Sequence, residues 1–437
     1  MRFLDDRRFR RAFAVLAIFT TLAGEVWRYS MGWLGFGIIA SLLAGFSIAI
    51  IIRERARWSF NRLPYPLLAF FVLTVASLAW SFYPGATALG ILATWMTVAG
   101  AFAVALCFSW PEFVFLLSRA LRIILGLSIV FELVVSLFIR RPVLPLVPAP
   151  GVDYSDLSNP PKLLYWSRDL LFEGGKIQGI VGNSSLLAFV ALVGLIVFCV
   201  QFAAKSTHRG LTAFWIVVAV ANIALTRSAT ITVALVVLAF VVIVVLALRR
   251  AAPRAAAAIY AALVALVVGG IVAVTQLSGT LLGLLGKSSD LTGRLDIWDA
   301  VITLAQQRPA FGWGWVSWWV PWVAPFDTLA FEAGVRQLHA HNAWVDIFLQ
   351  LGIAGLILFG LLVLGTGIRS WQLATQIEII SPAKPGRFTA ISLLPLLLLV
   401  ALLVQSVAES RLLVEYGLLT LVLIAVKTKV HARPVAV

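Results

Sequence analysis

Stretches of about 20 apolar residues recur along the whole chain, and this recurrence constrains the fold more than any other feature. A run of that length can cross the hydrocarbon core of a bilayer as an α-helix. The 437-residue chain is 61% hydrophobic and only 12% charged, with a mean hydropathy of +1.00. The sequence therefore predicts an all-α, polytopic membrane protein with about twelve transmembrane helices. Residues 1–437 are expected to form a single integral membrane domain.

We expect the helices at about residues 11–27, 32–52, 64–81, 87–108, 113–139, 178–203, 210–226, 228–248, 254–276, 341–367, 388–407 and 412–427. The first two are the weakest, because Glu25 and Arg28 interrupt what reads equally well as one re-entrant hairpin. The N-terminus has the basic and apolar regions of a signal peptide, but no A-x-A-like cleavage site follows them. We therefore interpret this run as a retained first helix.

The distribution of positive charge predicts the orientation in the membrane. A net charge of +15 would suggest a nucleic-acid partner in a soluble protein. Here most Lys and Arg residues lie in every second connection between predicted helices, and the N-terminus belongs to this basic group. Basic short connections are typical of the cytoplasmic side. An even number of helices then puts both termini in the cytoplasm. Two long loops, 140–177 and 277–340, fall outside, and the second immediately precedes the tenth helix.

The second loop is the most polar interruption of the chain, and we interpret it as the external catalytic loop. It combines charged residues with many tryptophans in an otherwise apolar sequence. Trp313, Trp315, Trp318, Trp319 and Trp322 are typical of an interfacial aromatic belt, or of an amphipathic helix lying on the membrane surface as a lid. Stacking on sugar rings is the functional alternative.

Two arginines at the predicted outer boundary are candidates for binding a phosphate or pyrophosphate. Arg227 lies in a Thr-Arg-Ser turn between two apolar runs with no linker, and Arg294 lies in the second external loop. Guanidinium groups stay charged and form bidentate hydrogen bonds with phosphate oxygens. Snorkelling at a helix end would explain Arg227 without a function. An ion pair with Asp290 or Asp296 would similarly explain Arg294.

His341 opens an apolar run at the same boundary and is the candidate general base, because the free pKa of histidine, about 6.5, suits proton transfer near neutral pH. If its helix starts near Ala340, Gly352 and Gly355 lie within about 40° of it on one face. The two glycines would let a neighbouring helix approach closely, and His339 would point elsewhere. A structural role is the alternative for a lone histidine.

Glu409 and Arg411 lie between the last two predicted helices and add ionisable groups to this boundary. Such groups at membrane depth usually face the bundle interior or a watery cavity.

The sequence contains no nucleotide-binding, zinc or hydrolase motif. A G-x4-G-K-[ST] phosphate loop would need glycine at position 281, which is Leu281, and H-E-x-x-H, C-x-x-C and G-x-S-x-G do not occur. Cys107 and Cys199 lie inside apolar runs and imply neither a disulfide framework nor a metal site. No metal ion and no cofactor are predicted.

The histidine and its glycines resemble a known signature. His341-Asn342 followed after nine residues by Gly352-x-x-Gly355 resembles the H-[NSQ]-x9-G-x-x-G pattern of the bacterial O-antigen ligase and polymerase superfamily. Ligases often have Thr or Ser after the second glycine, where this chain has Leu356. The resemblance therefore leaves ligase or polymerase open.

Other parts of the chain are similar to the same family. Arg227 and the Glu409-Ser410 pair also match the family's pattern. So does the segment before the histidine, with Gly293-Arg294, Trp298, Arg308-Pro309 and Gly312-x-Gly314. The resemblance covers about residues 179–417, and the N-terminal third is similar only in hydropathy.

The resemblance implies a C-type, multispanning glycosyltransferase in the bacterial cytoplasmic membrane. It would transfer a polyprenyl-pyrophosphate-linked glycan to a glycan, lipid or protein acceptor on the periplasmic or external face, with inversion and without a metal ion. Membrane lipids would be further partners, and nucleic acid would not.

The same resemblance gives roles to the boundary residues. Arg227 and Arg294 would stabilise the pyrophosphate, and His341 would orient or deprotonate the acceptor hydroxyl. Glu409 would orient His341 or contact the acceptor. We expect Asn342, Arg411 and Trp298 as further substrate-binding residues.

A lipid-linked oligosaccharide flippase, or another polytopic transporter, is the competing hypothesis. In such a transporter, an external arginine pair would bind the anionic head group of the lipid. The halves of the sequence show no inverted or parallel repeat, however, and Glu132 is the main ionisable residue near mid-membrane.

Overall fold

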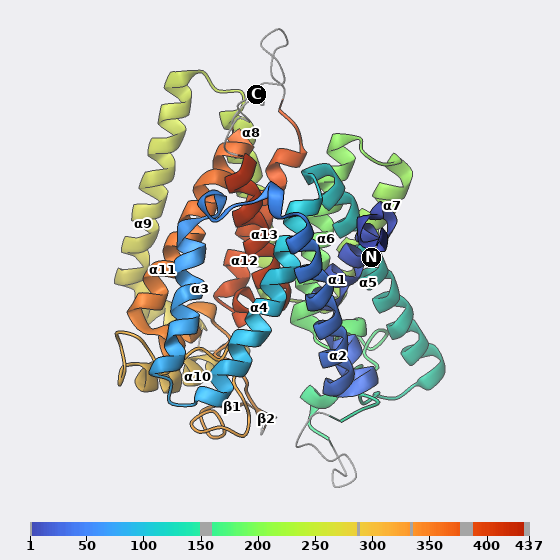
Figure 1. Cartoon of the computed structure of the whole chain (residues 1–437), viewed down its shortest axis with the longest axis vertical. Coiled ribbons are helices and arrows are strands. Elements are labelled where there is room, and N and C mark those ends of the chain that lie inside the picture. Colours follow the sequence, from blue (N-terminus) through green and yellow to red (C-terminus); the bar gives the residue numbers. More distant parts are fainter. Residues whose placement is uncertain (1, 149–159, 286–288, 333–334, 376–387, 432–437) are drawn as a thin grey trace.

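The computed structural model describes residues 2–148, 160–285, 289–332, 335–375 and 388–431, and within them it is almost wholly helical (Figure 1). Eight of the described helices are long and apolar enough to cross a membrane. They are α2 (Gly24–Arg53), α4 (Pro84–Cys107), α5 (Trp110–Val134, continued by a π-helical turn to Ile139), α6 (Ser184–Ala204), α7 (Arg209–Thr226), α8 (Ala229–Leu248), α9 (Pro253–Leu285) and α11 (Ala343–Thr375).

Four shorter helices match the remaining predicted ranges. They are α1 (Arg7–Leu22), α3 (Tyr65–Ala76), α12 (Leu394–Ser406) and α13 (Glu415–His431). Each predicted range thus overlaps one helix of the described chain, and the all-α, polytopic membrane architecture is confirmed. The N-terminal hairpin is resolved into two helices, and α2 is kinked at Gly32, whose φ is 72°.

The bundle is built around α6. In the most apolar stretch of α6, 78% of the residues are buried. In the corresponding stretch of α9, 0% are buried. Helices α5, α7, α8 and α12 pack around α6. Apolar side chains of α9, such as Val264 and Val267, are exposed, which is the arrangement expected of a helix that faces lipid tails.

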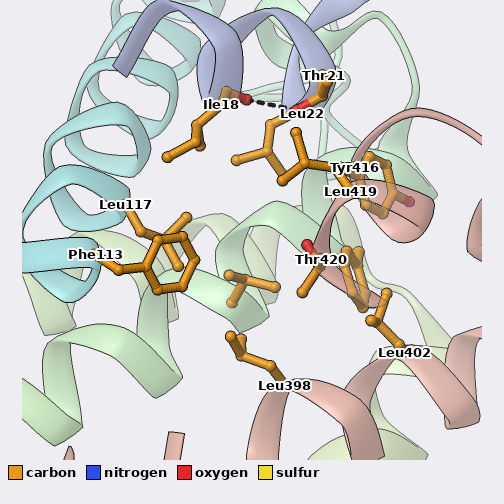
Figure 2. Close-up of a pocket in the computed structure, with 12 residues that line it drawn as sticks. Ile18, Thr21, Leu22, Phe113, Leu117, Leu398, Leu402, Tyr416, Leu419 and Thr420 are labelled. Carbon is orange, nitrogen blue, oxygen red and sulfur yellow. Dashed lines mark hydrogen bonds between the residues drawn. The ribbon is translucent and has the colours of Figure 1, made fainter. Parts of the chain in front are cut away.

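A small cavity lies among α1, α5, α6, α12 and α13 (Figure 2). Its lining is mostly apolar and includes Leu117, Phe189 and Leu402, and the hydroxyl of Thr21 beside it donates to the carbonyl of Ile18 (3.0 Å). Its volume is ≈ 20 Å³, enough for about one water molecule. A sugar does not fit there, so the chemistry must lie elsewhere.

Helix α11 is broken at Gly352, and a segment of the predicted external loop 277–340 is inserted into the break. Gly352 has φ 63° and ψ −159°. The freed backbone groups pair with residues 309–314, since Trp313 N donates to Leu349 O (3.0 Å) and Ile353 N donates to Pro309 O (2.8 Å). These bonds replace those that the break removes from the helix, which is essential for backbone at membrane depth.

Glycine is required on both sides of this junction. A Cβ at Gly352 would lie 2.5 Å from the carbonyl carbon of Ala310, and one at Gly312 would lie 2.5 Å from that of Gln350. The side chain of Gln350 completes the junction, because its Oε1 accepts from Val316 N (2.9 Å) and Ser317 N (3.0 Å). The predicted close approach at Gly352 therefore occurs, but to a loop and not to a neighbouring helix.

The predicted external loop 277–340 contains regular structure. Its first residues continue α9 to Leu285, and α10 (Ser289–Ala305) and the antiparallel pair β1 (Phe331–Glu332) and β2 (Val335–Arg336) follow. Figure 1 shows α10, β1 and β2 at the lower end, opposite the connection between α8 and α9.

The surface position predicted for the tryptophans is wrong for most of them. Trp315 and Trp319 are 0% and 1% exposed, Trp313 is also buried, and only Trp322 of this group is largely exposed. Trp315 reaches between α3 and α4, where its Nε1 donates to Thr94 Oγ1 (2.9 Å). The buried tryptophans anchor this segment in the bundle, since burial of large aromatic side chains is stabilising.

Glu132 is predicted near mid-membrane, but it lies near the end of α5 and holds the segment that precedes α6. Its Oε1 accepts from the backbone N–H groups of Gln178 (2.8 Å) and Gly179 (2.7 Å), and its Oε2 accepts from Ser167 Oγ (2.8 Å). These bonds satisfy a buried carboxylate and give it an anchoring role at the start of α6.

Candidate active site

His341 precedes α11 and is not part of the helix. The helix begins at Ala343, and His341 has φ 51°, in the left-handed region. The predicted placement of His341, Gly352 and Gly355 on one helix face is therefore wrong. The reason is local: Asn342 Oδ1 accepts from the N–H groups of Trp344 (3.0 Å) and Val345 (3.3 Å), so Asn342 caps the helix and His341 lies before the cap.

The imidazole of His341 lies between two oxygen atoms. Its Nδ1 is 3.4 Å from Oε2 of Glu409, and its Nε2 is 3.0 Å from Oε1 of Gln337. The ring is half-buried. A carboxylate on one nitrogen fixes the orientation of an imidazole and leaves the other nitrogen for proton transfer. The amide oxygen of Gln337 can only accept, so in this contact Nε2 carries a proton. With the proton on Nδ1 instead, facing Glu409, Nε2 is free to accept one.

Glu409 joins His341 to Arg294. The carboxylate follows α12, and its Oε1 is 3.6 Å from Nη2 of Arg294 on α10. Burial alone would raise the pKa of Glu409, but the charge and hydrogen bond of His341, together with Arg294 and Arg411, hold it below its ordinary value. The Arg294 side chain retains 22% exposure against 8% for Glu409, so the guanidinium can also reach a ligand. The predicted alternative is an ion pair of Arg294 with Asp290 or Asp296. Among the described side chains Arg294 pairs with Glu409 and not with Asp296, and the side chain of Asp290 lies outside the described ones.

His339, which was expected to point away, is a close neighbour of His341. The two ring centroids are 3.9 Å apart, and the backbone N–H of His341 donates to Nδ1 of His339 (3.0 Å). Burial, followed by the charges of His341, Arg411 and Arg294, lowers the pKa of His339 well below 6.5. His339 is therefore a neutral acceptor that holds the backbone of His341 in its left-handed conformation.

Arg411 stands behind these histidines and is buried in a network of charges. It pairs with Glu415 and lies 3.9 Å from Glu25, and Arg28 of α2 pairs with both carboxylates. The guanidinium carbon of Arg411 lies 4.8 Å from the ring of Trp318, which in turn contacts His339 at 4.5 Å between centroids. The start of α2, one of the two helices whose assignment was weakest, thus contributes to the wall of the site.

Trp298 and Asp346 fix the backbone around the histidines. Trp298 Nε1 donates to Ala340 O (2.9 Å), and Ala340 N donates to Asp346 Oδ2 (3.0 Å), which also accepts from Ser410. These contacts tie α10, α11 and the segment after α12 to one short stretch of chain. Gln337, His339 and Asp346 were not predicted, since none lies in a recognisable motif.

Arg227 is not joined to this cluster by any contact between described residues. It is the left-handed residue (φ 50°) between α7 and α8, as its turn predicted, and its side chain is exposed. A Cβ at Gly174 would lie 3.4 Å from Nη2 of Arg227, so the arginine is beside the first external segment. The structure brings together Arg294, His341, Glu409 and Arg411, and leaves Arg227 at the margin.

His339, His341 and Glu409 also form a group that is able to chelate a cation, since one ligand atom of each lies within 4.8 Å of the others. The permanent charge of Arg294 against Glu409 opposes a divalent ion there. His339 faces Glu409 with Nε2 at 4.0 Å. Its Nδ1 accepts the N–H of His341, so the proton of the neutral ring is on Nε2, which then has no lone pair for a metal ion. The donor set therefore fits an ion-paired carboxylate better than a metal centre.

Two comparisons with known proteins found matches to parts of this chain. Residues 212–360 match the family model described as O-antigen ligase, and this range contains Arg227, Arg294 and His341. The chain is also 34% identical over 103 residues to the exopolysaccharide production protein ExoQ of Rhizobium meliloti (strain 1021). That alignment spans 22% of this chain and 24% of ExoQ, so the chain covers only about a quarter of this relative's length. The matched range is about a third of the chain, and in this part the chain is similar to the O-antigen ligase family.

Proposed function

We propose that the protein is a membrane glycosyltransferase whose donor is a polyprenyl-pyrophosphate-linked glycan. The acceptor, a glycan, lipid or protein hydroxyl, would be on the outer face of the cytoplasmic membrane. The observation that carries this proposal is the position of Glu409, whose carboxylate lies within 4 Å of both the guanidinium of Arg294 and the imidazole of His341, three groups from separate segments. The family match supports the reaction class.

In the proposed reaction the acceptor oxygen bonds to the anomeric carbon as the bond from that carbon to the pyrophosphate oxygen breaks. The hydroxyl proton passes to Nε2 of His341, where the acceptor replaces Gln337 Oε1. Glu409 orients the ring and stabilises the imidazolium. Polyprenyl pyrophosphate leaves with the bonding electrons, and a single displacement inverts the anomeric configuration.

Arg294 has the geometry to stabilise the leaving pyrophosphate. Its guanidinium is held loosely by Glu409 at 3.6 Å, and developing negative charge on the leaving group would strengthen its binding in the transition state. Arg227 would serve the same leaving group from the margin of the site. Asn342, Trp298 and Arg411 are proposed to act through the backbone and the rings that they position, and not by direct contact with the glycan.

The test is transfer in vitro by the purified full chain, with a polyprenyl-pyrophosphate oligosaccharide and candidate acceptors. His341→Ala and Arg294→Ala are expected to lower kcat by at least about 10²-fold, the contribution typical of a general base or of one charge-stabilising group. Arg336→Ala is the matched control, because Arg336 is an exposed arginine of the same external segment. Full activity in folded His341→Ala protein would refute the mechanism.

Two further measurements separate the alternatives. Activity in EDTA is expected to equal activity with added Mg²⁺ or Zn²⁺, and restoration by metal would instead assign a metal to His339, His341 and Glu409. A lengthened glycan on the lipid carrier would indicate a polymerase, and glycan on another acceptor a ligase. Movement of the donor across proteoliposomes without transfer would favour the flippase alternative.

A further inference from the structure

The side-chain amide of Gln337 covers the nitrogen of His341 that the proposed reaction needs. Its oxygen lies 3.0 Å from Nε2 of His341, and Gln337 is only 9% exposed. The orientation of the amide is set by its other contact, because the amide nitrogen donates to Val335 O (3.1 Å). The oxygen therefore faces the imidazole. Because an amide oxygen only accepts, Nε2 of His341 holds a proton in this contact and cannot take one from a hydroxyl group.

The backbone around Gln337 is fixed by hydrogen bonds that do not involve its side chain. Gln337 N donates to Ala330 O (3.0 Å), and Trp319 N donates to Leu338 O (2.9 Å). Among the described residues, the side-chain amide has only two hydrogen bonds, one to a backbone carbonyl and one to His341. Rotation of this one side chain would therefore uncover Nε2 of His341 without displacing the backbone on either side.

The protonation of the His341 ring changes when the amide leaves. While the amide is in place and the ring is neutral, Nδ1 carries no proton. Nδ1 then faces Oε2 of Glu409 at 3.4 Å without a hydrogen bond, as observed. A doubly protonated ring would satisfy both contacts but could accept no further proton. Once the amide leaves, the proton can reside on Nδ1, where it faces the carboxylate, and Nε2 becomes an acceptor for a hydroxyl group.

We propose that Gln337 is a specificity-determining residue that protects the lipid-linked donor from hydrolysis. The inference rests on the proposed function and concerns which hydroxyl group the site activates. Water at Nε2 of His341 would react as the acceptor does. Its oxygen would bond to the anomeric carbon, its proton would pass to Nε2, and the polyprenyl pyrophosphate would leave with the bonding electrons. The amide of Gln337 prevents this reaction as long as no acceptor is bound.

An acceptor can displace the amide more readily than water can. Either one must replace the contact of 3.0 Å between Gln337 and His341. A water molecule offers only its own hydrogen bonds for this exchange. An acceptor also binds through parts that do not react, and this binding energy offsets the loss of the amide contact. The amide thus makes activation of His341 depend on the rest of the acceptor.

The test measures hydrolysis and transfer in the same reaction, with the purified full chain, a polyprenyl-pyrophosphate oligosaccharide and the acceptor that the wild type uses. Gln337→Ala is expected to raise the ratio of free glycan to transferred glycan roughly fivefold, the factor that one ordinary hydrogen bond contributes. Gln337→Glu keeps an acceptor oxygen at Nε2 of His341, so it should lower transfer without raising this ratio. Gln306→Ala is the matched control, because Gln306 is an exposed glutamine of the predicted loop 277–340, and it should behave as the wild type.

A merely structural role of Gln337 would lower hydrolysis and transfer together and leave their ratio unchanged, and that result would overturn the proposal. A chemical probe tests the contact without the reaction. Diethyl pyrocarbonate acylates unprotonated imidazole nitrogens, and mass spectrometry of the peptide locates the label on His341. Labelling should be roughly fivefold faster in Gln337→Ala than in the wild type or in Gln306→Ala.

Equal labelling of the three proteins at His341 would show that the amide does not cover Nε2 and would refute the inference. A wild type that transfers glycan to no acceptor would refute the proposed function, and the labelling rates would still decide whether Gln337 covers the histidine.

Discussion

At the residue scale, the pairing of Glu409 with His341 is the contact on which the proposed chemistry depends most. Glu409→Gln keeps the shape of the side chain but removes the charge that orients and stabilises the imidazolium. We expect kcat to fall by at least about 10²-fold, with KM for the acceptor changed much less. Glu409→Asp should retain more activity than Glu409→Gln. Steady-state kinetics with both variants measure this, and full kcat in Glu409→Gln would contradict a catalytic function of the pair.

Because His339 is buried, we expect the stability of the folded protein to depend on pH. Its pKa in the folded protein is well below 6.5 because burial penalises the imidazolium. Below pH 6.5 the unfolded chain therefore binds a proton that the folded protein does not, and stability decreases as the pH falls, by up to about 1.4 kcal/mol per pH unit.

His339→Asn should reduce this pH dependence, because the amide oxygen still accepts from His341 N–H but does not titrate. Thermal unfolding in detergent between pH 7.5 and 5.5 measures the difference between the two proteins. The same slope in both would show that His339 does not remain neutral in the folded state.

At the scale of elements, the break in α11 determines where the external segment lies. Gly352→Ala would force a Cβ into the carbonyl of Ala310 at a left-handed backbone position, which costs about 1–3 kcal/mol from the backbone conformation alone. We expect a lower unfolding temperature and loss of transfer activity, since the displaced segment connects α10 to His341.

Gly360→Ala in the same helix is the matched control, since a Cβ there meets no atom within 4 Å. It should be neutral or slightly stabilising, because alanine is favoured over glycine in a helix by about 0.5–1 kcal/mol. Thermal unfolding and transfer assays on the pair test the junction. Equal behaviour of the two variants would mean that the loop is not held in the break.

At the scale of the whole molecule, the sequence predicts the membrane helices better than the contacts of the candidate site. Twelve apolar runs can be located because hydropathy is a local property, and Arg294 and His341 could be singled out because they interrupt it. Ion pairs join residues near the two ends of the chain: Glu25 and Arg28 contact Arg411 and Glu415. The sequence around these residues does not show that they pair. Likewise, burial of Trp315 depends on α3 and α4, which its own neighbourhood does not reveal.

The orientation of the molecule in the membrane remains a prediction, and it determines which substrates the site meets. The α8–α9 connection, which contains Arg250, lies at the end opposite α10 and the β1–β2 pair (Figure 1), and basic connections remain in the cytoplasm. In a variant without Cys107 and Cys199, Thr328→Cys should react with a membrane-impermeant maleimide in intact spheroplasts, and Arg250→Cys only after permeabilisation. The reverse pattern would place the candidate site in the cytoplasm, where an externally oriented lipid-linked donor could not reach it, and would refute the proposed transfer even if the geometry of His341, Glu409 and Arg294 were correct.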